Sequence, residues 1–337
     1  MKFGSGKVVY ILRQGHILLE KGGQKMQEKN RELSWNLKED LWEKFQKIWA
    51  WEGLQEVQLR IGQPVYILQN GVEKRLKEQN KESVIVTQQD LNQVLLHLCK
   101  YSVYAYEGER KQGFITLQGG HRLGIAGDVI MKNGVVEDFA HISSIHFRVA
   151  TQKKGLAEPF APFCYKDGIP VSIMVIAPPG VGKTTLLRDL ARMYSTGTEY
   201  GAGVSVTVVD ERSEIGGAYQ GVAQNDLGPR TDLLDGCEKT VGILMSLRSL
   251  SPAVIVVDEI GSRQELDALQ KVNCSGVSVL MSVHGKDLKE VKKRFEAHPF
   301  FENSMHRYIV IQKNRVQKRR YTMYSKEEQL LWQVEES

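Results

Sequence analysis

The residues most able to do chemistry lie in a glycine-rich segment near the middle of the chain. This segment reads APPGVGKTTL from Ala177 to Leu186, between the apolar run VSIMVI and the stretch LRDLARMY. Small residues let successive main-chain N–H groups face one anion at the positive end of the helix expected to follow. The ammonium of Lys183 can reach β- and γ-phosphate oxygens, and the hydroxyl of Thr184 can bind Mg²⁺. The segment therefore predicts a phosphate loop for ATP and Mg²⁺. Its predicted nucleotide-binding residues are Ala177, Pro178, Pro179, Gly180, Val181, Gly182, Lys183, Thr184 and Thr185.

Two further segments end in carboxylates. The run AVIVVDEIG places Asp258 and Glu259 directly after an apolar stretch. We expect Asp258 to hold Mg²⁺ together with Thr184, and Glu259 to polarise the attacking water. The run VSVTVVDERSEIGG supplies a second acidic group, with Glu211 at its centre. Both Glu211 and Glu259 are therefore candidate bases, and Glu259 is the preferred one.

A third run, VSVLMSVHG, ends in His284. A histidine there could sense the γ-phosphate or orient a carboxylate. The alternative is a partly exposed loop histidine without a catalytic role.

The elements that position these residues follow from the apolar pattern. The runs VSIMVIA, VSVTVVD, AVIVVDEI and VSVLMSV alternate with helical stretches, which is typical of a parallel sheet covered on both faces. Upstream, the spacing predicts a helix over residues 37–51, then strands, then a helix capped by Thr87, and finally a hairpin turning at KNG. We expect an α/β protein in which a doubly wound, mainly parallel sheet follows a smaller α+β domain. The expected division is a weakly ordered extension over 1–36, an α+β domain over 37–152, a linker over 153–168 and the ATPase domain over 169–337.

Composition excludes several other classes of protein. The chain has 337 residues, 42% hydrophobic and 25% charged, with a net charge of +5. This charge does not by itself indicate nucleic-acid binding, and no apolar run is long enough to span a bilayer. The four cysteines are far apart and have no metal-binding spacing. An intracellular protein with reduced thiols is expected.

Several longer motifs resemble one family. The segments RIGQP, GGHRLGIAG, HFRVA, APPGVGKTTLLRD, VVDERSEIGG, GVAQNDLGPRTDLLDGC, SLRSLSPAVIVVDEIG and SVHG together resemble stage III sporulation protein AA of endospore-forming bacteria. The same motif order is similar to that of RecA-like ATPases of type II and type IV secretion. The resemblance runs from about residue 37 to the end of the chain.

The resemblance implies an ATPase with a RecA-like P-loop NTPase domain that forms a ring, expected to be a hexamer. Arg148, in HFRVA, matches the place where secretion ATPases present an arginine to nucleotide, which implies a catalytic role in trans; the alternative is a surface strand arginine. The implied partners are membrane proteins of the channel between mother cell and forespore. The implied location is the cytoplasm on the mother-cell side, with peripheral membrane contact, and no nucleic acid is expected.

Two other functions remain open at this stage. RecA-like cores also serve nucleic-acid-dependent motors, because a fold does not fix a function. A slow, ATP-dependent assembly switch would use the same residues. The basic stretch KNRVQKRRYTMY could bind an anionic membrane or an acidic partner, although its alternation favours the solvated face of a hairpin.

Overall fold

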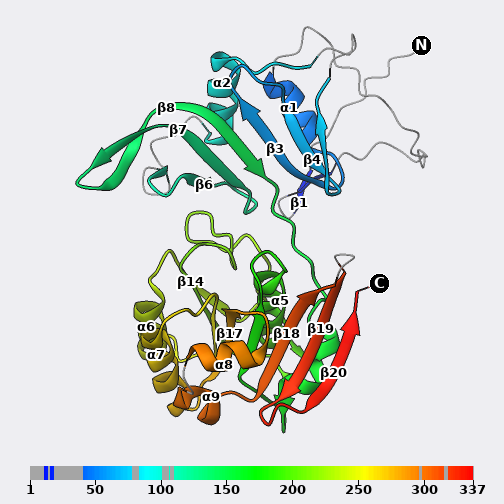
Figure 1. Ribbon diagram of the computed structural model, residues 1–337, viewed down its shortest axis with the longest axis vertical. Helices are drawn as coiled ribbons and strands as arrows, with labels where there is room; N and C mark the ends of the chain where they lie inside the picture. The colour runs from blue at the N-terminus through cyan, green and yellow to red at the C-terminus, as the bar shows by residue number, and fades with distance from the viewer. Residues whose placement is uncertain are drawn as a thin grey trace, which may run out of the picture. The chain divides into compact units, whose positions relative to one another are not determined.

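The computed structural model describes residues 11–13, 16–18, 41–77, 83–100, 106, 110–295, 298–314 and 318–336. The chain divides into two compact units, Met1–Val149 and Ala150–Ser337, which are coloured blue to green and green to red in Figure 1. Near the N-terminus, β1 (Ile11–Arg13) pairs antiparallel with β2 (His16–Leu18). The rest of the predicted extension over 1–36 lies outside the described residues.

The first unit is an antiparallel sheet with two helices. The strand order is β5-β4-β3-β8-β7-β6. The strands are β3 (Leu54–Arg60), β4 (Tyr66–Gln69), β5 (Val72–Arg75), β6 (Phe114–Thr116), β7 (Arg122–Lys132) and β8 (Val135–Arg148). The helices are α1 (Leu41–Trp49) and α2 (Gln88–Leu98). Both predicted helices are present in this α+β unit.

Local sequence signals account for the ends of these elements. Thr87 caps α2, and its side chain and that of Asp90 form a reciprocal capping box. The turn between β7 and β8 places Asn133 at φ 52° and Gly134 at φ 78°, the left-handed conformation that a tight hairpin turn requires.

Aromatic packing joins α1 to the sheet of the first unit. Phe45 on α1 packs edge-to-face on Phe147 of β8, with ring centroids 5.1 Å apart. The helix is thereby fixed to the sheet by buried aromatic contact.

The second unit contains an eight-stranded sheet in the order β15-β14-β16-β17-β11-β18-β19-β20. The first six strands in this order are parallel: β15 (Thr231–Asp235), β14 (Val206–Asp210), β16 (Val254–Val257), β17 (Ser278–His284), β11 (Ile173–Ala177) and β18 (Arg307–Lys313). At the red end of the chain in Figure 1, β19 (Arg319–Ser325) and β20 (Leu330–Glu335) extend the sheet antiparallel. In the basic segment predicted as the solvated face of a hairpin, Lys313 ends β18 and residues 319–324 belong to β19, which pairs with it.

Helices cover both faces of this sheet. The longer ones are α5 (Lys183–Thr196), α6 (Lys239–Ser249), α7 (Arg263–Cys274), α8 (Leu288–Arg294) and α9 (Pro299–Asn303). The shorter elements are η2 (Glu158–Phe160), α4 (Ala161–Cys164), β9 (Tyr165–Lys166), β10 (Ile169–Pro170), β12 (Gly197–Thr198) and β13 (Gly201–Ala202).

Strand β11, inside the parallel part of the sheet, shows why the apolar runs are continuous. Ile173, Val175 and Ala177 pack into the core that includes α5. Met174 and Ile176 point the other way, into the core that includes α7, α8 and α9. Side chains alternate between the faces of a strand, so a strand buried on both faces has no polar positions. This confirms the predicted doubly wound, mainly parallel sheet.

The segment predicted as a linker contributes to the core of the second unit. Ala157, Phe160 and Cys164 are buried among residues of α5 and β11. The main chain of Ala157 donates to the buried carboxylate of Asp189 on α5 at 2.8 Å. Residues 157–164 therefore pack as part of the second unit.

Candidate nucleotide site

The predicted phosphate loop joins β11 to α5. Gly180 has φ 71° and Gly182 has φ 113°, and at such angles a side chain is strained, so glycine permits the turn. Helix α5 begins at Lys183, directly after Gly182. Its first main-chain N–H groups lack partners within the helix, and they lie at the positive end of the helix dipole. The geometry is that of an anion-binding loop.

The remaining loop residues divide by exposure. Ala177 and Val181 are buried, and they anchor the two sides of the loop. Pro179 and Gly180 are exposed, while Pro178, Thr184 and Thr185 are partly exposed. A small Ala177 at the buried strand end is consistent with the tight turn that follows.

Thr184 and Asp258 provide oxygen donors at one end of the loop. The hydroxyl of Thr184 donates to Oδ2 of Asp258 at 2.5 Å. Oδ1 of Asp258 accepts from the hydroxyl of Ser282, which is buried on β17. Hydroxyl and carboxylate oxygens are ligands that Mg²⁺ prefers, with water and phosphate completing its shell. These two side chains fit the predicted magnesium role. Within the described ranges, no cluster of three or more His, Cys, Asp or Glu residues could hold a metal ion.

Lys183, His284, Glu259 and Arg212 form a continuous polar chain. The Nζ atom of Lys183 lies 2.8 Å from Nδ1 of His284, and Nε2 of His284 lies 2.8 Å from Glu259 Oε1. The other carboxylate oxygen of Glu259 lies 2.9 Å from Arg212 Nη1. Because an ammonium can only donate, Nδ1 of His284 accepts and Nε2 carries the proton given to Glu259. The histidine is therefore tied to the preferred base.

Burial lowers the pKa of the lysine. Lys183 is 4% exposed, and desolvation lowers the pKa of its ammonium against the opposing charge of Asp258 and Glu259. A phosphate oxygen at the loop would supply the counter-charge that favours the ammonium form.

The backbone at Glu259 is held in an uncommon conformation. Its φ is 53°, a left-handed value that costs a non-glycine residue of order 1–3 kcal/mol. Its N–H donates to Asp258 Oδ1 and to Ser282 Oγ, each at 3.0 Å. Its carbonyl accepts from Lys239 Nζ at 2.9 Å. The conformation persists because three neighbours fix it, and it directs the carboxylate toward His284.

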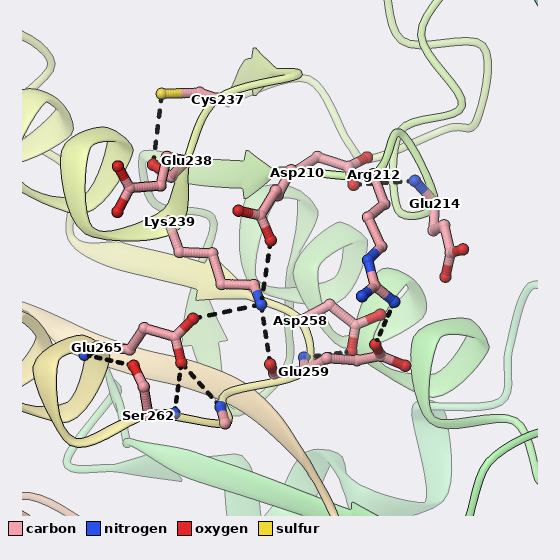
Figure 2. Close-up of polar contacts among 12 residues, drawn as sticks. Asp210, Arg212, Glu214, Cys237, Glu238, Lys239, Asp258, Glu259, Ser262 and Glu265 are labelled. Carbon is pink, nitrogen blue, oxygen red and sulfur yellow. Dashed lines mark hydrogen bonds and ion pairs between the residues drawn. The ribbon is translucent and has the colours of Figure 1, made fainter. Parts of the chain in front are cut away.

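Lys239 lies at the centre of the contacts in Figure 2. Its ammonium reaches Glu265 at 3.4 Å and the Glu259 carbonyl, both labelled in Figure 2. It also lies 3.3 Å from the carboxylate of Glu211. Although burial opposes it, N–H donors of the Gly261–Ser262 turn and the charge of Lys239 lower the pKa of Glu265. The second candidate base, Glu211, is thus engaged by a cation at this point.

Asp210, at the end of β14, organises the acidic loop of residues 210–216. Its carboxylate accepts main-chain N–H groups of Glu214, Ile215 and Gly216 at 2.8–2.9 Å. Burial raises the pKa of Asp210 to about 6 against these donors. From α5, Arg188 donates to the carbonyls of Glu214 and Ile215, each at 2.7 Å. The loop is thereby fastened to the helix that carries Lys183.

Arg148 belongs to the first unit, and its trans role stays a prediction. Its Nε lies 3.5 Å from Glu56 Oε2, and its side chain is 63% exposed.

Sequence reasoning missed three contacts of the site. Arg212 occurs within the quoted acidic motif, but nothing in the pattern pairs it with Glu259. Lys239 begins α6 without any motif around it. Ser282 lies within the quoted run VSVLMSVHG, but its bond to Asp258 follows only from β16 and β17 being neighbours.

The comparisons with known proteins agree with the motif resemblance. A family model described as sporulation stage III, protein AA, matches residues 23–331. Stage III sporulation protein AA of Bacillus subtilis (strain 168) is 43% identical over 244 residues, which is 72% of this chain and 77% of that protein. The family match begins before residue 37, so the predicted start of the resemblance was too late.

Solved structures of an ATPase and of a pilus motor share the fold. The ATPase DotB of Legionella pneumophila has a TM-score of 0.58 at 14% identity, covering 86% of this chain and 80% of that one. The pilus retraction motor PilT, solved with bound ADP, has a TM-score of 0.58 at 13% identity, covering 86% and 83%. The predicted RecA-like fold is confirmed. No helix within the described ranges is long and apolar enough to cross a membrane.

Proposed function

Because this chain belongs to the stage III sporulation protein AA family, we propose that it is an ATPase that works in endospore formation. The observation that carries the proposal is the convergence of Lys183, Thr184, Asp258 and Glu259 at neighbouring strand ends. Ligands of open α/β sheets bind at the carboxyl ends of the strands. The fold shared with secretion ATPases agrees with nucleotide binding.

In the proposed mechanism, the loop N–H groups and Lys183 bind the β- and γ-phosphates. Thr184 and Asp258 would hold Mg²⁺, whose charge would stabilise the phosphate oxygens during transfer. The hydrogen bond from Ser282 fixes the Asp258 carboxylate in place. Lys183 and Thr184 begin α5, and Asp258 directly follows β16, so the fold positions these side chains before charge develops.

Glu259 is the proposed base, in preference to Glu211. Its carboxylate contacts His284 and Arg212, whereas that of Glu211 contacts Lys239. A base must lie within hydrogen-bond reach of the water it activates. Glu259 directly follows the proposed magnesium ligand Asp258, and His284 connects it to Lys183 of the phosphate loop, which favours Glu259 over Glu211.

His284 links nucleotide binding to this base. A phosphate oxygen that accepts from Lys183 replaces Nδ1 of His284 as the partner of the ammonium. Nδ1 of the imidazole then loses its donor, while Nε2 still donates to Glu259. Occupancy of the phosphate site is thereby transmitted to the catalytic carboxylate.

The proposed assembly is a ring, a hexamer as the motif resemblance implies, acting on the channel between mother cell and forespore. Arg148 is proposed to contact nucleotide held by a neighbouring subunit. Membrane proteins of the channel are the proposed partners, with the ring at the cytoplasmic face on the mother-cell side. Nucleotide-dependent mass measurement would test the assembly.

Phosphate release by purified protein tests the reaction. We expect Glu259→Gln to lower turnover by about 10²-fold or more, since general base catalysis contributes about that much, with ATP binding retained. Glu211→Gln should have a smaller effect, and the exposed Glu199→Gln is the matched control. Equal turnover of the wild type and Glu259→Gln would contradict the assignment. Stimulation of turnover by DNA would favour a nucleic-acid motor instead.

A further inference from the structure

An arginine from the C-terminal part of the sequence lies against the phosphate loop of the second unit. A Cβ placed on Gly182 would lie 3.6 Å from Nε and 3.8 Å from Cζ of Arg319. Gly182 is the residue immediately before Lys183, and Arg319 is the first residue of β19. The guanidinium is therefore in contact range of the loop proposed to hold phosphates.

The hydrogen-bonding capacity of Arg319 is only partly used. Its Nη1 donates to both carboxylate oxygens of Glu336, at 3.2 and 3.3 Å. Its Nε is buried and has no acceptor among the described residues. A buried donor of a charged group without a partner is costly. This unsatisfied N–H belongs to the atom closest to Gly182, so it lies on the loop side of the side chain.

We propose that Arg319 binds the phosphate chain of the nucleotide in the same subunit, and that Glu336 competes for this arginine. The inference rests on the proposed function and adds a residue to the site. A guanidinium matches phosphate oxygens with two parallel N–H donors. The main-chain N–H at Gly182 faces the β-phosphate in a loop of this kind, so the ligand class is a nucleoside di- or triphosphate.

The position of Glu336 is set by the pairing of β19 with β20. Its main-chain N–H donates to the Arg319 carbonyl at 2.7 Å, and its carboxylate accepts from the Tyr321 hydroxyl at 3.2 Å. Burial, with the charge of Glu336, raises the pKa of Tyr321 to about 12, so the phenol remains a donor. Glu336 retains the tyrosine as a partner when a phosphate takes the arginine.

The neighbouring arginine supplies a matched control. Arg320 is the next residue of β19, and strand geometry turns its side chain to the other face. Its guanidinium donates to Glu335 at 3.0 Å and is 46% exposed. Arg320 thus matches Arg319 in charge and lies beside it on the same strand, but it is Arg319 that lies against the phosphate loop.

The test is calorimetric titration of the full chain with MgADP and with MgATP. Arg319→Gln should lower the affinity for MgADP and for MgATP by similar factors of about 10 or more, as expected for loss of a charge-assisted contact. Arg319→Lys should recover part of this loss, and Arg320→Gln should bind within about 2-fold of the wild type. Glu336→Gln should bind more tightly, because it leaves Arg319 without its competing carboxylate. Thermal unfolding confirms that each variant is folded.

Wild-type binding with equal binding by folded Arg319→Gln would overturn the role of Arg319 and leave the proposed function intact. Failure of the folded wild type to bind either nucleotide would overturn both. Should Arg319→Gln fail to fold, Glu336→Gln decides, because a merely structural ion pair would give unchanged or weaker affinity in that variant.

Discussion

Replacing Lys239 by Met should damage catalysis more than nucleotide binding. Lys239 is 12% exposed and contacts two carboxylates and the Glu259 carbonyl (Figure 2). Methionine preserves most of the volume and removes the charge. The change leaves Glu265, 16% exposed, without its cation. It also removes one of the three contacts that hold the left-handed backbone of Glu259.

The structure sets the expected magnitude. Breaking a buried ion pair costs about 3–5 kcal/mol. Solvent reaches Glu211, which is 36% exposed, so its share is reduced. We expect a loss of about 2–3 kcal/mol in the free energy of unfolding, or roughly 5–10 °C in Tm for a unit of this size. A shift of about 1 Å in a catalytic group costs up to about 10²-fold in rate, so turnover should fall at least about 10-fold.

Phosphate-release kinetics and denaturant unfolding measure the two effects separately. KM for ATP should change by less than about 3-fold, because Lys239 does not touch the phosphate loop. Lys239→Arg should recover part of both losses, and the exposed Lys289→Met on α8 is the matched control. Wild-type turnover by a destabilised Lys239→Met protein would refute the idea that this lysine positions Glu259.

Three further changes test other parts of the site. Folded Asp210 holds its proton up to about pH 6, whereas the unfolded residue loses it near pH 4, so its stabilising contribution falls as pH rises between these values. Urea unfolding should find wild type more stable relative to Asp210→Asn at pH 4.5 than at pH 7.5, by about 2 kcal/mol; no pH dependence of the difference would contradict this. Gly216→Ala would place a Cβ 2.7 Å from a Leu233 methyl and should cost about 1–3 kcal/mol, whereas the uncrowded Gly261→Ala should cost less. Arg148→Ala should lower turnover without weakening ATP binding by isolated subunits. If Arg148 acts in trans, mixing Arg148→Ala subunits with Glu259→Gln subunits should restore part of the turnover. No recovery in the mixed rings would count against action in trans.

The sheet of the second unit was predictable because both of its faces are buried. Continuous apolar runs such as VSIMVIA mark strands of this kind, and the glycine loop between β11 and α5 marks the change of element. The strand ends also carried Asp258 and His284, so the positions of the main chemical groups followed from the sequence.

The ion-pair network could not be predicted in the same way. Arg212 meets Glu259, and Lys239 meets Glu211, because parallel strands bring distant loops to one edge of the sheet. Exposed or half-buried charges carry no periodic signal. The contact of Arg319 with the loop depends on β18 pairing beside β11 and on β19 returning antiparallel. These contacts depend on topology, which local patterns do not specify.

Calorimetric titration of the wild type and of Lys183→Ala with MgATP tests the central claim most directly. The wild type should release or absorb heat that saturates with bound nucleotide, and folded Lys183→Ala should give no saturable heat over the same range. The exposed Lys271→Ala on α7 should match the wild type. Equal binding by Lys183→Ala, or no binding by a folded wild type, would contradict the account.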